Sequence, residues 1–248
     1  MRTVLLFSLL VWLLGNPLLA GLIVVAAFGG SYLLFSRRLY GWRRRWRELG
    51  EVRRLRAALA INSENAKAHS DLGGLLARRG RFAEALPHLE KAIVRCDDLP
   101  DTNFFLGWTL LKQGNPDEGR RRVATALAID PRFGYGEPRL RLGDYYFGRK
   151  EFREAIPHFE ASREVHASGM EAAAKLGESY LAIGDPDRAA TVLRDAVAIY
   201  RTLPWFRKQE ERGWARKAKA AWRRARRAAG GSRSATGASP GGSPGASR

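Results

Sequence analysis

The sequence has a single cysteine, Cys96, among 248 residues. One cysteine cannot form a disulfide within the chain or supply a cysteine cage for a metal ion. Histidine is also scarce, and the four histidines lie far apart in the sequence. We therefore expect no metal and no cofactor. The cysteine usage is consistent with a reducing compartment.

The sequence also lacks a motif that would indicate catalysis. Gly29-Gly30 lies inside an apolar run and lacks the lysine of a phosphate-binding loop. His88 and His158 follow prolines at equivalent places in the chain, which favours a structural or solvent-facing role. We expect no enzymatic activity and no small-molecule substrate.

No charged side chain occurs between Thr3 and Phe35. Gly15-Asn16-Pro17 divides this run into Val4–Leu14 and Leu18–Phe35. The second part would be about 27 Å long as a helix, close to the roughly 30 Å hydrocarbon core of a bilayer. The pattern predicts a transmembrane anchor over residues 1–36, with its main span over 18–35. It leaves open whether residues 4–14 also cross.

A cleaved signal peptide is the alternative interpretation of this apolar run. Signal peptides have a shorter apolar region that is followed by small residues at the cleavage site. Here the run continues past such a point, and Leu18-Leu19-Ala20 places a bulky leucine where a small residue is preferred. The sequence favours the uncleaved anchor.

Acidic residues are few in the two flanks of the chain. Residues 37–60 carry nine arginines against two glutamates, and residues 201–248 carry thirteen basic residues against two glutamates. The first cluster directly follows the predicted span, where basic residues mark the cytoplasmic side. We expect a single-pass protein of the bacterial inner membrane with its C-terminal part in the cytoplasm. The arginines expected at the anionic lipid surface are Arg37, Arg38, Arg43, Arg44, Arg45 and Arg47.

A repeat is the main feature that the sequence does contain. Four Leu-Gly pairs recur, with their glycines at positions 73, 107, 143 and 177, spaced 34, 36 and 34 residues apart. Each glycine is followed after twelve residues by alanine or glycine, and seven residues later by alanine or serine. A bulky apolar residue stands between the two small ones, at Leu89, Val123, Phe159 and Leu193. Small residues are expected where two helices approach closely, and large ones where they fill space between units.

This pattern resembles the tetratricopeptide repeat (TPR) family. The resemblance implies an all-α TPR solenoid of antiparallel helix pairs, here preceded by the N-terminal transmembrane helix. The four implied repeats cover residues 66–203, as 66–99, 100–135, 136–169 and 170–203. Lys150 departs from the pattern because it stands where a turn glycine falls in the other repeats, and residues 133–136 contain a two-residue insertion.

Three segments flank the implied repeats. Residues 37–65 are expected to form a basic juxtamembrane helix and a degenerate half-repeat. Residues 204–229 are expected to form a basic capping helix in which Trp205, Trp214, Ala218 and Trp222 cover the open apolar end of the stack. Residues 230–248 are rich in Gly, Ser, Pro and Ala and are expected to be disordered.

The resemblance implies a groove lined by the first helix of each pair, in which a segment of another protein binds. Aromatic and arginine side chains are typical hot spots of such interfaces. The groove residues that we expect to bind the partner are Arg78, Phe104, Trp108, Lys112, Arg141, Asp144, Lys175 and Glu178. The alternative for either phenylalanine of the Phe104-Phe105 pair is that it packs between repeats.

The sequence therefore predicts a non-catalytic, membrane-anchored scaffold that binds a protein partner of unknown identity. Two alternatives stay open. The basic C-terminal segment, where Trp and Arg alternate with Lys over 205–227, is compatible with contacts to nucleic acid. The chain is also compatible with a regulatory or assembly subunit of a membrane enzyme complex.

Overall fold

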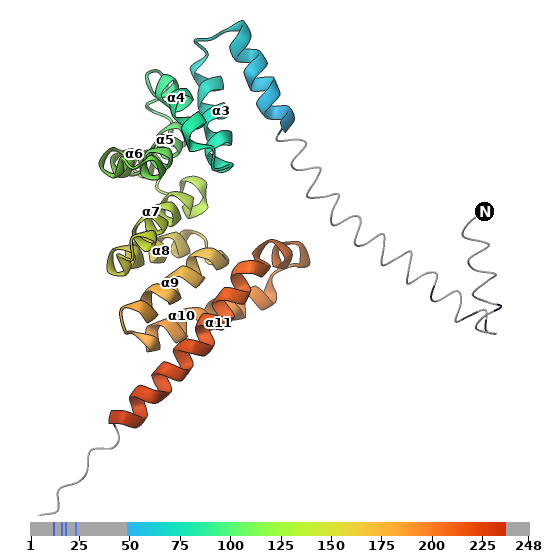
Figure 1. Cartoon of the computed structure of the whole chain (residues 1–248), viewed down its shortest axis with the longest axis vertical. Coiled ribbons are helices and arrows are strands. Elements are labelled where there is room, and N and C mark those ends of the chain that lie inside the picture. Colours follow the sequence, from blue (N-terminus) through green and yellow to red (C-terminus); the bar gives the residue numbers. More distant parts are fainter. Residues whose placement is uncertain (1–11, 13–15, 17, 19–22, 24–48, 237–248) are drawn as a thin grey trace, which may run out of the picture. The chain divides into compact units, whose positions relative to one another are not determined.

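The computed structural model describes residues 12, 16, 18, 23 and 49–236 (Figure 1). The predicted anchor and the arginines at 37–47 lie outside the described residues, apart from those four single positions. Among the residues that are described, no helix is both long enough and apolar enough to cross a bilayer. The chain divides into two compact units, residues 1–63 and 64–248, and in the first unit residues 49–61 are helical.

The second unit is built from helices that pack in consecutive pairs, in chain order. Residues 49–236 contain no strand, so the prediction of an all-α solenoid is confirmed for this part of the chain. The helices are α3 (Ala66–Arg78), α4 (Phe82–Ile93), α5 (Pro100–Gln113), α6 (Pro116–Ile129), the 3₁₀ turn η1 (Phe133–Gly136), α7 (Glu137–Gly148), α8 (Phe152–Val165), α9 (Met170–Ala182), α10 (Pro186–Thr202) and α11 (Trp205–Thr236).

Local sequence signals define where these helices begin. The side chain of Asn65 accepts a hydrogen bond from the Ala68 amide at the start of α3, and Asp185 accepts one from the Arg188 amide at the start of α10. Proline occupies the first turn of α5, α6, α7 and α10, where a backbone N–H would have no partner within the helix. These five helices therefore begin at residues that suit an N-terminus.

Glycine allows the two helices of each pair to approach closely. A Cβ atom built on Gly73 or Gly143 would lie 2.5 Å from Leu89 or Phe159 of the partner helix. In the second pair a Cβ on Gly107 would lie 2.7 Å from the backbone oxygen of Gly119. Because that contact is with backbone and not with a side chain, the backbones of α5 and α6 approach more closely than those of the other pairs. This explains why position 119 is glycine where the other pairs have alanine.

The inserted residues before α7 form η1, which positions the start of the third pair. The backbone at Gly134, Tyr135 and Gly136 has positive φ. The hydroxyl of Ser162 donates a 2.9 Å hydrogen bond to the backbone oxygen of Gly136. A Cβ on Gly136 would lie 2.8 Å from the backbone oxygen of Ser162. The insertion is thus anchored to α8 by a contact that requires glycine.

Helix α11 packs on α9 and α10 at the end of the stack. Ala215, Ala218 and Ala221 are buried against Met170 and its neighbours, with Trp214 and Trp222 packed beside them. Trp205 is 74% exposed, so the expectation that it covers the open end is wrong. It lies in the first turn of α11, ahead of the first side chain of this helix that packs on the stack.

The prediction of disorder from residue 230 is wrong for residues 230–236, because α11 continues through them to Thr236. Each residue added to a nucleated helix gains one hydrogen bond, and glycine weakens a helix by about 1 kcal/mol without terminating it, so Gly230 and Gly231 do not end α11. Residues 237–248 lie outside the described residues.

Candidate partner-binding face

Phe104 and Trp108 lie inside the stack and do not line an open groove. Phe104 is 1% exposed and Trp108 is 8% exposed, which corrects the expectation for both. The Trp108 ring stacks on the ring of Phe104 at 5.8 Å and packs edge to face with Phe82 of α4 at 5.4 Å. Phe133 of η1 covers Phe104 from the next pair. The insertion before α7 therefore closes over the aromatic residues of α5.

The first helices of successive pairs contact one another through matched side chains. Phe105 of α5 fills the space left by Gly74 of α3, where a Cβ would lie 2.9 Å from the ring. The guanidinium of Arg141 in α7 lies 4.9 Å from the centre of the Trp108 ring in α5. Lys175 of α9 forms an ion pair with Asp144 of α7. Each contact joins the residue that follows the Leu-Gly glycine of one pair to the residue two places before that glycine in the next pair, so residues 31 or 33 positions apart in sequence become partners.

Arg141 and Lys175 are held in a network with three carboxylates. Arg141 lies 2.9 Å from Asp144, 3.3 Å from Glu137 and 3.4 Å from Glu171, and Lys175 lies 2.6 Å from Glu171. The five side chains are between 13% and 27% exposed. Burial alone would lower the pKa of Arg141, but Glu171, Asp144 and Glu137 outweigh it and raise the pKa.

This network explains three of the predicted site residues. Arg141, Asp144 and Lys175 do lie together, as the groove prediction requires, but their charges are already paired with one another. Lys175 also lies 4.9 Å from the Trp214 ring of α11, so the cap covers one end of the network. Glu178 faces Arg224 of α11 at 3.5 Å. The third and fourth pairs therefore present a face whose charges are largely satisfied internally.

The first two pairs present a different face. Arg78 and Lys112 occupy the last turns of α3 and α5 and are both exposed. The Arg78 guanidinium lies 4.9 Å from the centre of the Phe105 ring, so it reaches from α3 across to α5. Among the described residues neither cation has an acidic partner, in contrast to Lys67, which pairs with Asp71 and Asp101. We call Arg78 and Lys112 the basic pair.

Two contacts made by histidine side chains were not predicted from the sequence. His69 of α3 and His88 of α4 are joined by a 2.8 Å hydrogen bond between their Nδ1 atoms. In the third pair, His158 stacks on Tyr146 with ring centres 5.3 Å apart, and Arg139 occupies the position that His69 has in α3. Burial and the nearby charge of Arg139 lower the pKa of His158. The shared separation of 19 residues, from His69 to His88 and from Arg139 to His158, was the available signal.

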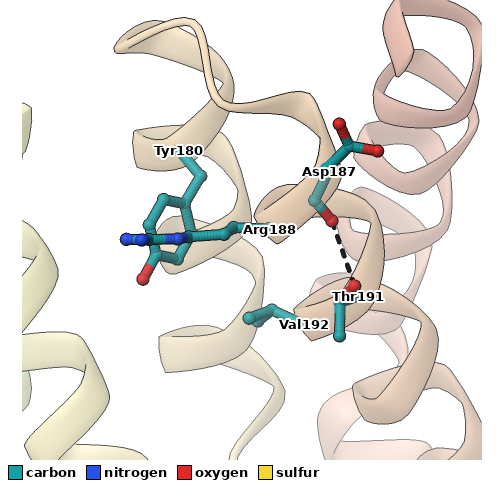
Figure 2. A pocket seen from close by; sticks show the side chains of 5 residues that line it. All are labelled: Tyr180, Asp187, Arg188, Thr191 and Val192. Carbon is teal, nitrogen blue, oxygen red and sulfur yellow. Dashed lines mark hydrogen bonds between the residues drawn. The ribbon is translucent and has the colours of Figure 1, made fainter. Parts of the chain in front are cut away.

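A hollow on the outside of the fourth pair contains polar groups that already have partners (Figure 2). It has a volume of about 270 Å³ and is lined by Tyr180, Asp187, Arg188, Thr191 and Val192. The Thr191 hydroxyl donates to the Asp187 backbone oxygen, and the Tyr180 hydroxyl donates to Glu160. Burial and that bond to Glu160 raise the pKa of Tyr180, so its hydroxyl stays protonated at neutral pH. The hollow offers no activated nucleophile.

Comparison with known proteins identifies the repeat. A family model described as tetratricopeptide repeat matches residues 52–100 and 140–204, and a second model of the same description matches residues 104–125. No curated protein matches the chain at a significant level of sequence similarity.

Several solved structures have a similar fold. A crystal structure of MamA is 19% identical, covers 64% of this chain and 92% of its own, and has a TM-score of 0.55. A second MamA structure is 18% identical, covers 70% and 93%, and has a TM-score of 0.54. YrrB, described as a TPR protein with an unusual peptide-binding site, is 22% identical, covers 69% and 85%, and has a TM-score of 0.51. With its helix pairs, their glycine contacts and the matching family models, this chain belongs to the tetratricopeptide repeat family.

Proposed function

We propose that this chain is a non-catalytic scaffold that holds a protein partner at the bacterial cytoplasmic membrane. The family and the fold support a role in protein interaction, and the apolar segment at 1–36 supports the membrane location. The partner would bind on the first helices of the pairs. YrrB, which has a similar fold, is itself described as having a peptide-binding site.

One observation supports a particular site for the partner. Arg141 and Lys175 of the third and fourth pairs are neutralised by Glu137, Asp144 and Glu171, whereas the basic pair on α3 and α5 has no carboxylate partner among the described residues. An acidic segment of a partner would supply the missing charge, and the side chain of Arg78 can make bidentate contacts to a carboxylate. The proposed site is therefore the α3–α5 end of the stack, and the partner segment is acidic.

The test is differential capture by the full chain from detergent-solubilised membranes. The double variant Arg78→Glu/Lys112→Glu should lose a partner that the parent chain retains. Lys91→Glu is the matched control, because Lys91 is also an exposed cation in the last turn of its helix, but on α4. A photo-crosslinker at Gln113 should join the same partner, and one at position 91 should not. Equal capture by the double variant and the control would disprove the site.

The membrane location has its own test. The full chain should sediment with membranes and resist extraction at alkaline pH, and a variant without residues 1–36 should not. A protease added to intact spheroplasts should leave the repeats uncut, because the arginines at 37–56 favour a cytoplasmic orientation. Recovery of the full chain in the soluble fraction would contradict the anchor without affecting the proposed partner site.

A further inference from the structure

Helix α11 has two faces of different chemistry. One face packs on α9 and α10 through a stripe of alanines, Ala215, Ala218, Ala221 and Ala225, each at most 2% exposed. With 100° per residue, a stripe at such spacings of three and four places the rest of the helix toward solvent. The opposite face is therefore free of the stack over most of the helix.

Four exposed arginines lie along this free face, at Arg212, Arg216, Arg223 and Arg227. Their spacings of four, seven and four residues place them within a sector of about 60° and along about 22 Å of helix. We call these four residues the arginine stripe. Lys219 borders the stripe on one side and lies over the Tyr200 ring, and Gly213 and Ala220 border it on the other side and add no charge.

The arginine stripe has no counter-charge among the described residues. Other cations of α11 have partners, since Lys217 and Arg226 lie over the rings of Trp214 and Trp222, and Arg224 faces Glu178. The only acidic residues of α11, Glu210 and Glu211, pair with Arg207 before the stripe begins. Four like charges in one row repel one another, and an anionic surface alongside them would relieve this repulsion. The arginine stripe should therefore attract such a surface strongly.

Two exposed aromatic residues precede the stripe. Trp205 is 74% exposed and Phe206 is 52% exposed, and their rings pack edge to face at 6.2 Å. Trp205 lies seven residues before Arg212, which on a helix places it on the same side as the stripe. A row of arginines next to exposed aromatic rings suits the bilayer interface, where guanidinium groups meet anionic headgroups and tryptophan lies at headgroup level.

The same features disfavour nucleic acid. Base stacking requires accessible aromatic rings along the basic surface. Trp214 and Trp222 pack toward α9 and α10, so they are turned away from the arginine stripe. The free face between Arg212 and Arg227 also carries no amide or hydroxyl side chain that would contact a base edge.

We infer that α11 is a second membrane contact, in which the arginine stripe binds anionic lipid headgroups and Trp205 and Phe206 enter the interface. The inference rests on the proposed function only in that the anchor brings α11 to a bilayer. Binding by α11 would hold the end of the stack opposite the basic pair against the membrane.

The test uses the full chain in lipid nanodiscs, with a fluorescent label at Ala220→Cys. Cys96 is buried and stays unlabelled under native conditions. A quencher on the lipid headgroups should reduce the fluorescence at least twofold in discs with 30% phosphatidylglycerol, and little in discs of phosphatidylcholine alone. Addition of 1 M NaCl should restore the fluorescence, because the Debye length then falls to about 3 Å.

Changing the whole arginine stripe to glutamine should abolish the quenching. The control changes four exposed cations outside α11, Lys91, Arg95, Arg132 and Arg153, to glutamine and so removes the same total charge. Equal quenching in both kinds of disc, or in the stripe variant, would overturn the inference. So would tight, salt-sensitive RNA binding that anionic discs fail to compete away. Failure of the anchor would appear separately, as loss of the chain from neutral discs.

Discussion

Lys150, two residues after the end of α7, has a backbone conformation that glycine adopts at the equivalent position of the other pairs. Its φ is 63°, and the equivalent Gly80, Gly114 and Gly184 have φ of 75°, 87° and 81°. The left-handed region costs a residue with a Cβ roughly 1–2 kcal/mol relative to glycine. Lys150→Gly should therefore raise the free energy of unfolding by about 0.5–1 kcal/mol, after allowing for the greater freedom of glycine in the unfolded chain.

Urea denaturation followed by circular dichroism measures this change. Lys91→Gly is the control, because the same substitution at a helical φ in α4 should lower the free energy of unfolding by about 0.5–1 kcal/mol. Opposite signs for the two variants are expected. A lower stability of Lys150→Gly would show that the lysine side chain makes a contact worth more than the backbone strain.

His158 makes the stability of the third pair depend on pH. Its pKa is lowered by burial, and further by Arg139, so the unfolded chain binds a proton more readily than the folded chain. Stability is therefore full above the ordinary pKa of 6.5 and is lost as the pH falls from 6.5 toward the lowered value. Between pH 7.5 and pH 5.5 the urea midpoint should fall, and it should fall less in His158→Phe, which keeps a ring against Tyr146. An identical fall of the urea midpoint in the parent chain and in His158→Phe would show that His158 is not the cause of the pH dependence.

At the scale of the element, Arg141 joins α5, α7 and α9. Replacement by methionine keeps an apolar stem but, among the described residues, leaves Asp144 and Glu171 paired only with Lys175 and leaves Glu137 without a cation. Breaking a buried pair costs about 3–5 kcal/mol, and these side chains are partly exposed, so we expect a loss of about 1–3 kcal/mol. Lys67→Met removes two ion pairs, to Asp71 and Asp101, made by a lysine that is 56% exposed, and should cost less than about 1 kcal/mol. Urea denaturation of both variants compares them, and equal losses would contradict the cooperative network.

The elements themselves were predictable, whereas the contacts between repeats were not. Each helix pair is defined by local signals, such as Gly73 packed on Leu89 or Pro116 at the start of α6, and such signals can be read along one stretch of chain. The burial of Phe104 depends on how far η1 folds back over α5, and the pairing of Trp108 with Arg141 depends on how one repeat is rotated on the next. Neither the fold of η1 over α5 nor the rotation between repeats has a local sequence signal. The groove predicted from the family pattern therefore included Phe104 and Trp108, which are buried in the structure.

At the scale of the whole molecule, a stack of repeats is stabilised by contacts between neighbours, so its end needs a cap. Helix α11 supplies that cap through Ala218, which is fully buried against α9 and α10. Ala218→Asp would bury a carboxylate without a partner and should detach α11. Ala220→Asp introduces the same side chain two residues away on the free face and is the matched control.

Hydrogen exchange measured by mass spectrometry shows where the stack opens. In Ala218→Asp the amides of α9 and α10 should exchange at least tenfold faster, while those of α3 and α4 change little, because each repeat contacts only its neighbours. Ala220→Asp should match the parent chain throughout. Uniformly faster exchange from α3 to α10 would mean instead that the four pairs unfold as one cooperative unit. The cap would then stabilise the partner-binding end at α3 and α5 as much as the end at α9 and α10.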